Sequence, residues 1–263
     1  MIFPKVYAEQ LEALYARYNR REFVCPDPLQ FLYGYADVRD REIAGFVASA
    51  LAYGRVAQIL RSVAAVLEIM GPRPRAYLES AADDALARTF GGFRHRFTSG
   101  DELAAMLAGI RSVLDRHGSL NACFVSYLDP AAPDTLDAAA GLVREIHTGD
   151  ALSSLLACPT RGSACKRLHL YLRWMVRRDD VDPGGWTGVS PAQLVVPLDT
   201  HMFAIGRALG FTQRRQADGK TAVEMSAAFR QIVPQDPVRY DFALTRLGIR
   251  SDTDMAAFLA SCR

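Results

Sequence analysis

Apolar side chains recur with the period of an α-helix along almost the whole chain, and this pattern constrains the fold more than any other feature of the sequence. One such stripe, with the spacing i, i+3, i+4, consists of Ile43, Phe46 and Val47, which would share one helix face. Runs that alternate apolar and polar residues, as strands do, are absent apart from the short stretch 194–198. The sequence therefore predicts an all-α fold with roughly ten to twelve helices.

Residues that typically start or end helices indicate the boundaries. Asp40 is expected to cap a helical stretch that continues to residue 70, where Gly71 and Pro72 end it, and Gly118 is expected to end a later helix. No break between helices is long enough to be a flexible linker, so the chain is expected to form a single helical unit, residues 1–263. The expected helices span residues 5–20, 40–70, 103–117, 120–128, 135–147, 150–157, 164–178, 200–209, 221–233 and 237–247.

The composition argues against several classes of protein. Half of the 263 residues are apolar, but no apolar run approaches the roughly 18 residues that span a membrane. The first 21 residues carry charges throughout and lack the apolar segment of a signal peptide. The five cysteines are scattered, without the paired spacing of a metal site or a disulfide framework. We therefore expect a cytoplasmic protein, a monomer, without a metal, a cofactor or a membrane partner.

The charges are distributed unevenly along the chain. Residues 160–250 hold 14 lysines and arginines against 8 acidic residues, whereas residues 1–159 hold 16 against 19. A basic segment of this kind is what a nucleic-acid contact requires. An arginine-rich surface that only faces solvent would show the same excess, so the charge alone does not decide between the two.

The segment 155–178, LLACPTRGSACKRLHLYLRWMVRR, reads as helix, tight hairpin, helix. Pro159 and Gly162 are expected to break the chain, and the second helix starts near residue 164. Its first turn would present free amide groups and the positive end of the helix dipole, which suit a phosphate. The residues expected to contact nucleic acid are Arg161, Gly162, Ser163, Arg167 and Arg173, with His201 further along the chain.

A second stretch, PLDTHMFAIGRALG, contains Asp199 directly before an expected helix. An aspartate in this position is a good N-cap, because one of its oxygens can accept a backbone amide of the first turn. Lys166 lies in the first turn of the helix after the hairpin, where the helix dipole disfavours a cation. This placement suggests a functional lysine. The cap and a catalytic role for Asp199 are compatible, since a carboxylate has two oxygens.

The stretches SACKR and LDTHMFAIGRALG together resemble the helix-hairpin-helix DNA glycosylases, the superfamily of endonuclease III and the 8-oxoguanine glycosylases. Members place a lysine just after the hairpin and an aspartate in a similar downstream stretch, as Lys166 and Asp199 are placed here. Their separation is longer than in endonuclease III and resembles that of the archaeal 8-oxoguanine glycosylases. Longer segments, such as EIAGFVASALAYGRV and DPVRYDFALTRLGI, are most similar to a bacterial conserved-domain family of unknown function.

The glycosylase resemblance implies a bundle of two helical lobes, with Lys166 and Asp199 at the mouth of the cleft between them. Lys166 would attack C1′ of the nucleotide, Asp199 would serve as electrostatic partner and base, and the resulting Schiff base would permit strand cleavage. The damaged or modified purine would leave the stack of a DNA duplex and enter an aromatic pocket. The candidates for this pocket are Trp174, Trp186 and Tyr240.

The sequence also departs from the glycosylase pattern. Only one glycine, Gly162, follows Pro159 in the hairpin, and no cluster of four cysteines exists near the C-terminus, which excludes an iron–sulfur glycosylase. The loop 179–191, DDVDPGGWTGVSP, lacks the ligand register of a calcium loop. This loop is expected to be a lid or to contact a nucleic-acid strand.

Two alternatives stay open. A non-catalytic nucleic-acid-binding protein of the same fold would not need Lys166, whereas charge reversal of Arg167 or Arg173 would abolish its binding. An N-glycoside hydrolase would use the same carboxylate on RNA or on a free nucleoside. A competition between duplex DNA and RNA separates this hydrolase from a DNA repair enzyme.

Overall fold

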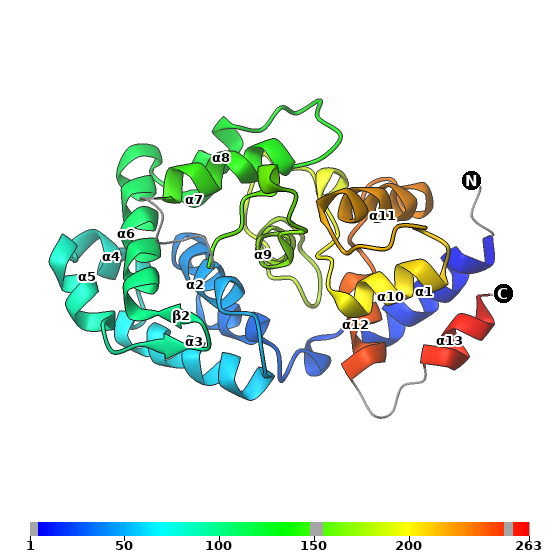
Figure 1. The fold of residues 1–263 in the computed structure, drawn as a ribbon, viewed down its shortest axis with the longest axis horizontal. Coiled ribbons are helices and arrows are strands. Elements are labelled where there is room, and N and C mark those ends of the chain that lie inside the picture. Colours follow the sequence, from blue (N-terminus) through cyan, green and yellow to red (C-terminus); the bar gives the residue numbers. More distant parts are fainter. Residues whose placement is uncertain (1–4, 148–154, 250–254, 263) are drawn as a thin grey trace.

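The computed structural model describes residues 5–147, 155–249 and 255–262, and these residues form α-helices with one short β-hairpin (Figure 1). This arrangement confirms the all-α prediction. Most of the helix expected over residues 150–157 lies outside the described residues. The α-helices are α1 (Lys5–Tyr18), α2 (Val38–Ala50), α3 (Val56–Met70), α4 (Pro74–Ser80), α5 (Asp83–Phe90), α6 (Gly100–His117), α7 (Leu120–Ser126), α8 (Leu136–Ile146), α9 (Lys166–Val176), α10 (Thr200–Ala208), α11 (Gly219–Ile232), α12 (Asp241–Ile249) and α13 (Met255–Ser261). The 3₁₀ helices are η1 (Arg21–Phe23), η2 (Pro28–Gly34), η4 (Pro159–Arg161) and η5 (Pro191–Gln193), and the strands are β1 (Arg94–His95) and β2 (Thr98–Ser99).

The stretch expected as one helix from residue 40 to residue 70 is two helices, α2 and α3. Gly54 lies between them with a φ of 98°, a left-handed conformation that a continuous α-helix does not contain. The cap was also predicted wrongly, because α2 begins three residues earlier and Asp37 caps it by accepting the Arg39 amide at 2.9 Å. Asp40 instead accepts the amide of Arg75 in α4 at 2.9 Å.

Helix α9 lies in the middle of the molecule, with α2–α6 on one side and α1, α10 and α12 on the other (Figure 1). Helix α2 packs directly on α9, while α1 and α10 both pack on α12. The contact between α2 and α9 includes Phe46 and Tyr171, whose rings meet edge to face at 4.9 Å. Trp174 and Met175 of α9 are also buried. Helix α9 is therefore a core element that both groups of helices share.

Arg173 joins α9 to two other parts of the chain. Its Nε lies 3.1 Å from an oxygen of Asp182, in the loop after α9, and its Nη1 donates to Asp241 at the start of α12. The three side chains are at most 3 % exposed. Arg173 was expected to contact nucleic acid, and for a contact at the protein surface this prediction is wrong, because its buried guanidinium pairs with two carboxylates.

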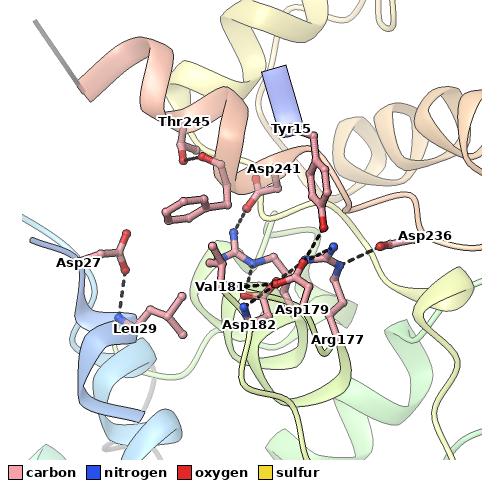
Figure 2. A network of polar contacts seen from close by, with 12 residues as sticks. Tyr15, Asp27, Leu29, Arg177, Asp179, Val181, Asp182, Asp236, Asp241 and Thr245 are labelled. Carbon is pink, nitrogen blue, oxygen red and sulfur yellow. Dashed lines mark hydrogen bonds and ion pairs between the residues drawn. The ribbon is translucent and has the colours of Figure 1, made fainter. Parts of the chain in front are cut away.

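Arg177, one turn further along the chain, extends this buried network (Figure 2). It pairs with Asp182, with Asp179 at 2.8 Å and with Asp236 at 2.9 Å, and Tyr15 of α1 donates to Asp179. Asp179 and Asp182 thus hold the loop 179–191 against α9, whereas Asp180 is exposed. Because buried charges are tolerated only when they are paired, this network fixes α9 against α1 and α12.

None of the described helices has both the length and the apolar character that a membrane span requires. The two strands form the only sheet within the described residues, an antiparallel pair that joins Arg94 to Ser99 and His95 to Thr98. The run 194–198, which showed the one alternating pattern in the sequence, is extended but unpaired with any strand in the part of the chain that the structure describes.

Candidate active site

The turn before α9 breaks the chain at the predicted residues, but residues 155–157, expected to end a preceding helix, are not helical. The 3₁₀ helix Pro159–Arg161 is followed by Gly162 with a φ of 78°, and α9 begins directly after Cys165. The carbonyl oxygen of Gly162 accepts the amide of Gly219 at 2.9 Å, which ties the turn to the start of α11. Residues 161–163 are exposed, so the three turn residues expected to contact nucleic acid are accessible.

Asp199 and Lys166 come together although 33 positions separate them in the sequence. Oδ1 of Asp199 accepts the amide of Met202 at 2.8 Å and caps α10. Oδ2 of Asp199 lies 3.0 Å from Nζ of Lys166. The side chains of Lys166 and Asp199 are 36 % and 21 % exposed, so the pair is partly shielded and still open to a ligand. The two oxygens of one carboxylate thus have separate tasks, as the sequence suggested.

Opposing effects set the pKa of Asp199. Burial raises this pKa. The Lys166 ammonium and the hydrogen bond from the Met202 amide lower it by more than burial raises it, so the pKa lies below the usual value for an aspartate. The carboxylate is therefore ionised at neutral pH. A fixed negative charge next to an amine suits the stabilisation of a cation that develops nearby.

Lys166 and Asp199 both line a cavity of about 530 Å³. Helices α2, α3, α9, α10 and α12 all contribute to its wall, so it lies where the two groups of helices meet. Its volume falls within the roughly 300–1,000 Å³ typical of small-molecule sites. The aromatic residues in the wall are Phe46, Tyr53, Trp174 and Phe242.

Trp174 and Asp241 in the cavity wall each have a buried polar atom without a hydrogen-bond partner among the described residues. These are the indole Nε1 of Trp174, a donor, and Oδ1 of Asp241, an acceptor when the carboxyl is ionised. Burial raises the pKa of Asp241 to about 6, although the charge of Arg173 opposes this shift. A buried donor or acceptor without a partner is costly, so a polar ligand or water that reaches either atom would offset this cost.

Arg167 faces the same cavity. Its Nη1 donates to the carbonyl oxygen of Ala50 at 2.6 Å, and its guanidinium lies 4.8 Å from the centre of the Tyr53 ring. Burial lowers the pKa of this guanidinium. Arg167 thus connects α9 to the end of α2. Its expected contact with nucleic acid stays a prediction, and it would require the nucleic acid to enter the cavity.

Two of the three residues predicted for the base pocket belong to the core instead. Trp186 packs edge to face on Tyr171 at 5.2 Å and donates from Nε1 to Glu42 at 3.0 Å. Tyr240 is buried and donates its hydroxyl hydrogen to Glu12 at 2.6 Å. Neither lines the cavity, because each aromatic ring is already held by a carboxylate and by core packing. Of the three, only Trp174 lines the cavity.

Two residues of the site were not predicted from the sequence, and His201, a predicted nucleic-acid contact, lies at the surface. His201 is exposed in the first turn of α10, next to Asp199 and accessible to a nucleic acid. Tyr53 and Asp241 line the cavity from α2–α3 and α12, yet no motif marks either of them. Asp241 is recognisable only through its place in the cavity wall, which depends on how α9 and α12 pack.

This geometry defines a class of protein: an all-helical protein with a lysine–aspartate pair at the wall of an aromatic cavity. Residues 27–250 match the family described as protein of unknown function (DUF2400), and the chain belongs to that family. No curated protein and no solved structure matches the chain.

Proposed function

We propose that this protein is a DNA glycosylase with AP lyase activity, which excises a damaged or modified purine through a Schiff base on Lys166. The observation that carries the proposal is the 3.0 Å contact between Nζ of Lys166 and Oδ2 of Asp199 at the wall of the cavity. The turn before α9, with its exposed residues 161–163, supports a helix-hairpin-helix fold of this class. The cavity would be the cleft between its two lobes.

The chemistry requires a neutral amine and a nearby negative charge. Nζ of Lys166 must first lose a proton, and Oδ2 of Asp199 is the adjacent acceptor. The nitrogen then forms a bond to C1′ while the bond from C1′ to the base breaks, and the leaving base takes up a proton. Opening of the sugar ring gives the Schiff base. Loss of a proton from C2′ then breaks the C3′–O bond and releases the 3′ strand.

Asp199 would act mainly through its charge. Positive charge develops on the sugar as the base departs, and a preorganised carboxylate stabilises it without having to reorient. The cap to Met202 holds Oδ1 in place, so Oδ2 cannot rotate away from Lys166 without loss of that hydrogen bond. A low pKa keeps the carboxylate charged. This lowers its strength as a base and favours its electrostatic role.

The cavity wall fits a flat heterocycle with polar edges. Phe46, Tyr53 and Phe242 supply aromatic surface, while Trp174 offers a donor and Asp241 an acceptor without partners in the described residues. A purine carries both donors and acceptors on its edge. We expect Trp174→Phe to weaken excision about tenfold, the effect of one lost hydrogen bond of roughly 1.4 kcal/mol.

Nucleic-acid binding is supported by the basic segment 160–250. The buried network removes Arg173 and Arg177 from the surface, but it removes Asp182 and Asp241 as well. The excess of basic over acidic residues in this segment therefore persists among its remaining side chains. Exposed Arg161 lies in the turn before α9, five positions before Lys166 in the sequence.

Reduction with borohydride tests the proposal most directly. The protein is incubated with a panel of duplexes, each with one modified purine, and a reduced Schiff base appears as a covalent protein–DNA adduct. Lys166→Gln is expected to abolish the adduct while binding of a non-cleavable duplex persists. Lys220→Gln is the matched control, since Lys220 is exposed in the first turn of α11 and is one of three lysines in the chain.

The outcomes separate the three possible functions. An adduct that depends on Lys166 supports the glycosylase. Binding of duplex DNA without an adduct on any member of the panel would favour a non-catalytic nucleic-acid-binding protein. Release of a base from RNA or from a free nucleoside, with duplex DNA as a poor competitor, would favour an N-glycoside hydrolase of another kind.

A further inference from the structure

The hairpin formed by β1 and β2 presents an aromatic side chain to solvent at its tip. Phe97 is 76 % exposed, the highest value among the exposed large apolar residues of the described chain. Single exposed apolar residues are common on proteins, so this exposure alone does not indicate a function. Phe97 also lies on a fixed hairpin, beside the cavity and among basic residues, and these features together indicate a binding role.

The hairpin is held firmly against the end of α2. The hydroxyl group of Tyr53 donates to the carbonyl oxygen of His95 and lies 2.7 Å from Oγ1 of Thr98. The buried His95 ring contacts the hydroxyl of Ser62 at 2.9 Å and the carbonyl oxygen of Tyr53 at 3.0 Å. Because both strands are anchored through side chains, Phe97 is presented from a rigid support.

The same contacts place the tip beside the cavity. Tyr53 and Gly54 line the cavity, and the Arg96 side chain packs on Gly54 so closely that a Cβ there would lie 2.6 Å from Cδ of Arg96. The Arg96 guanidinium also lies 5.3 Å from the centre of the Phe97 ring. Phe97 is therefore one side chain removed from the cavity wall at Tyr53 and Gly54.

Positive charge surrounds the exposed ring. Arg94 and Arg96 flank it in the hairpin, and Arg55 precedes α3 on the same side of the cavity. All three are exposed, and no acidic side chain in the described ranges forms an ion pair with them. An aromatic ring between unpaired arginines matches a nucleic-acid duplex, where phosphates flank a stack of bases.

We propose that Phe97 enters the base stack of duplex DNA beside the nucleotide that occupies the cavity, while Arg94 and Arg96 contact the neighbouring phosphates. This inference rests on the duplex DNA partner of the proposed function. A base that leaves the duplex opens a gap in the stack, and an apolar wedge that fills the gap compensates for part of the lost stacking. Phe97 thereby stabilises the extruded state without contact with the reacting atoms.

A duplex with 2-aminopurine next to the modified purine tests the wedge independently of the chemistry, because this base fluoresces more strongly when it is unstacked. We expect the wild type to raise the fluorescence. Phe97→Ala should reduce this rise by about fivefold or more, since the gap in the stack is no longer filled. Phe97→Leu, which keeps an apolar wedge, should retain most of it. The matched control is Ile69→Ala, which removes another exposed apolar side chain, 45 % exposed, near the far end of α3.

Excision provides the second measurement. Phe97→Ala should slow single-turnover excision from the duplex by about tenfold or more, and leave excision from the same oligonucleotide as a single strand unchanged, since a single strand has no paired stack to open. Equal loss on both substrates, no loss on the duplex, or a loss with Ile69→Ala as large as with Phe97→Ala would overturn the wedge. Fluorescence that rises through Phe97 without any excision would refute the glycosylase and leave the wedge standing.

Discussion

Replacement of Asp199 by asparagine separates the two tasks of its carboxylate. Asparagine keeps an oxygen for the Met202 amide, so the change of cap should cost less than about 1 kcal/mol of unfolding free energy. The ion pair with Lys166 is lost, but that side chain is 36 % exposed, and pairs as exposed as this stabilise a protein by about 0–1 kcal/mol. The variant is therefore expected to fold and to remain close to the wild type in urea unfolding.

The effect on excision should be much larger. The substitution removes a full negative charge whose oxygen lies 3.0 Å from the attacking nitrogen. Loss of one preorganised electrostatic contact to a transition state commonly slows a reaction by at least about 100-fold, or roughly 2.7 kcal/mol. Single-turnover excision on the substrate found with the borohydride panel measures this directly, because it isolates the chemical step from product release.

Asp218 supplies the matched control. It caps α11 in the same way, with its Oδ1 accepting the Thr221 amide at 2.9 Å, but it pairs with Arg214 on the surface and does not line the cavity. Asp218→Asn should lose as little stability as Asp199→Asn and retain full excision. If Asp199→Asn loses stability and excises at the wild-type rate, Asp199 is a helix cap only, and the proposed chemistry is wrong.

Three further predictions concern folding and binding. Arg177→Met should lower the free energy of unfolding in urea by about 3–5 kcal/mol, because it leaves Asp182 buried without one of its two cations; an equal effect of the exposed change Lys220→Met would contradict this reasoning. Burial raises the pKa of Glu42 from 4.5 to about 6, so the stabilisation from its protonated form is present below pH 4.5 and lost as the pH rises through 6. Between pH 4.5 and 7 the wild type should therefore lose about 2 kcal/mol of unfolding free energy relative to Glu42→Gln. An unchanged difference would refute the raised pKa of Glu42. DNA affinity should fall with salt with a log–log slope of roughly −3 to −4.5, and Arg161→Ala should make it shallower by about 0.9 without a change in unfolding; a slope that does not move removes Arg161 from the interface.

Features that depend on the local spacing of residues, such as helices and their ends, were predicted well from the sequence. Helices with a long apolar stripe, such as α6, were found, and Gly118 ends α6 in a left-handed conformation as expected. The short helices α4, α5 and α13 were missed, because seven or eight residues make only about two turns and show the helical period weakly. Helix α7 is as short and was found. The approach of Lys166 to Asp199 was also predicted, but through a family resemblance and not through periodicity.

Burial of charged residues was the main failure. Arg173 and Arg177 follow the helical spacing of a polar face, and such positions usually face solvent. Their partners Asp182 and Asp241 lie 9 and 68 positions after Arg173, so only the tertiary packing shows that two cations and two carboxylates can be buried together. Trp186 was misplaced for the same reason, since its carboxylate partner, Glu42, precedes it by 144 positions.

The buried network and the candidate site share Arg173 and Asp241, which both line the cavity, and this decides which substitutions can test nucleic-acid binding. Asp241 engages Arg173 with one oxygen and leaves the other without a partner among the described residues, at the cavity wall. Charge reversal of Arg173 would therefore disturb the fold and the cavity together, and a loss of DNA binding in that variant would carry no information about a DNA contact. Arg161 is exposed in the turn before α9 and belongs to neither the network nor the cavity wall. If Arg161→Ala binds DNA more weakly and unfolds as the wild type does, the variant has lost a contact between DNA and the protein surface.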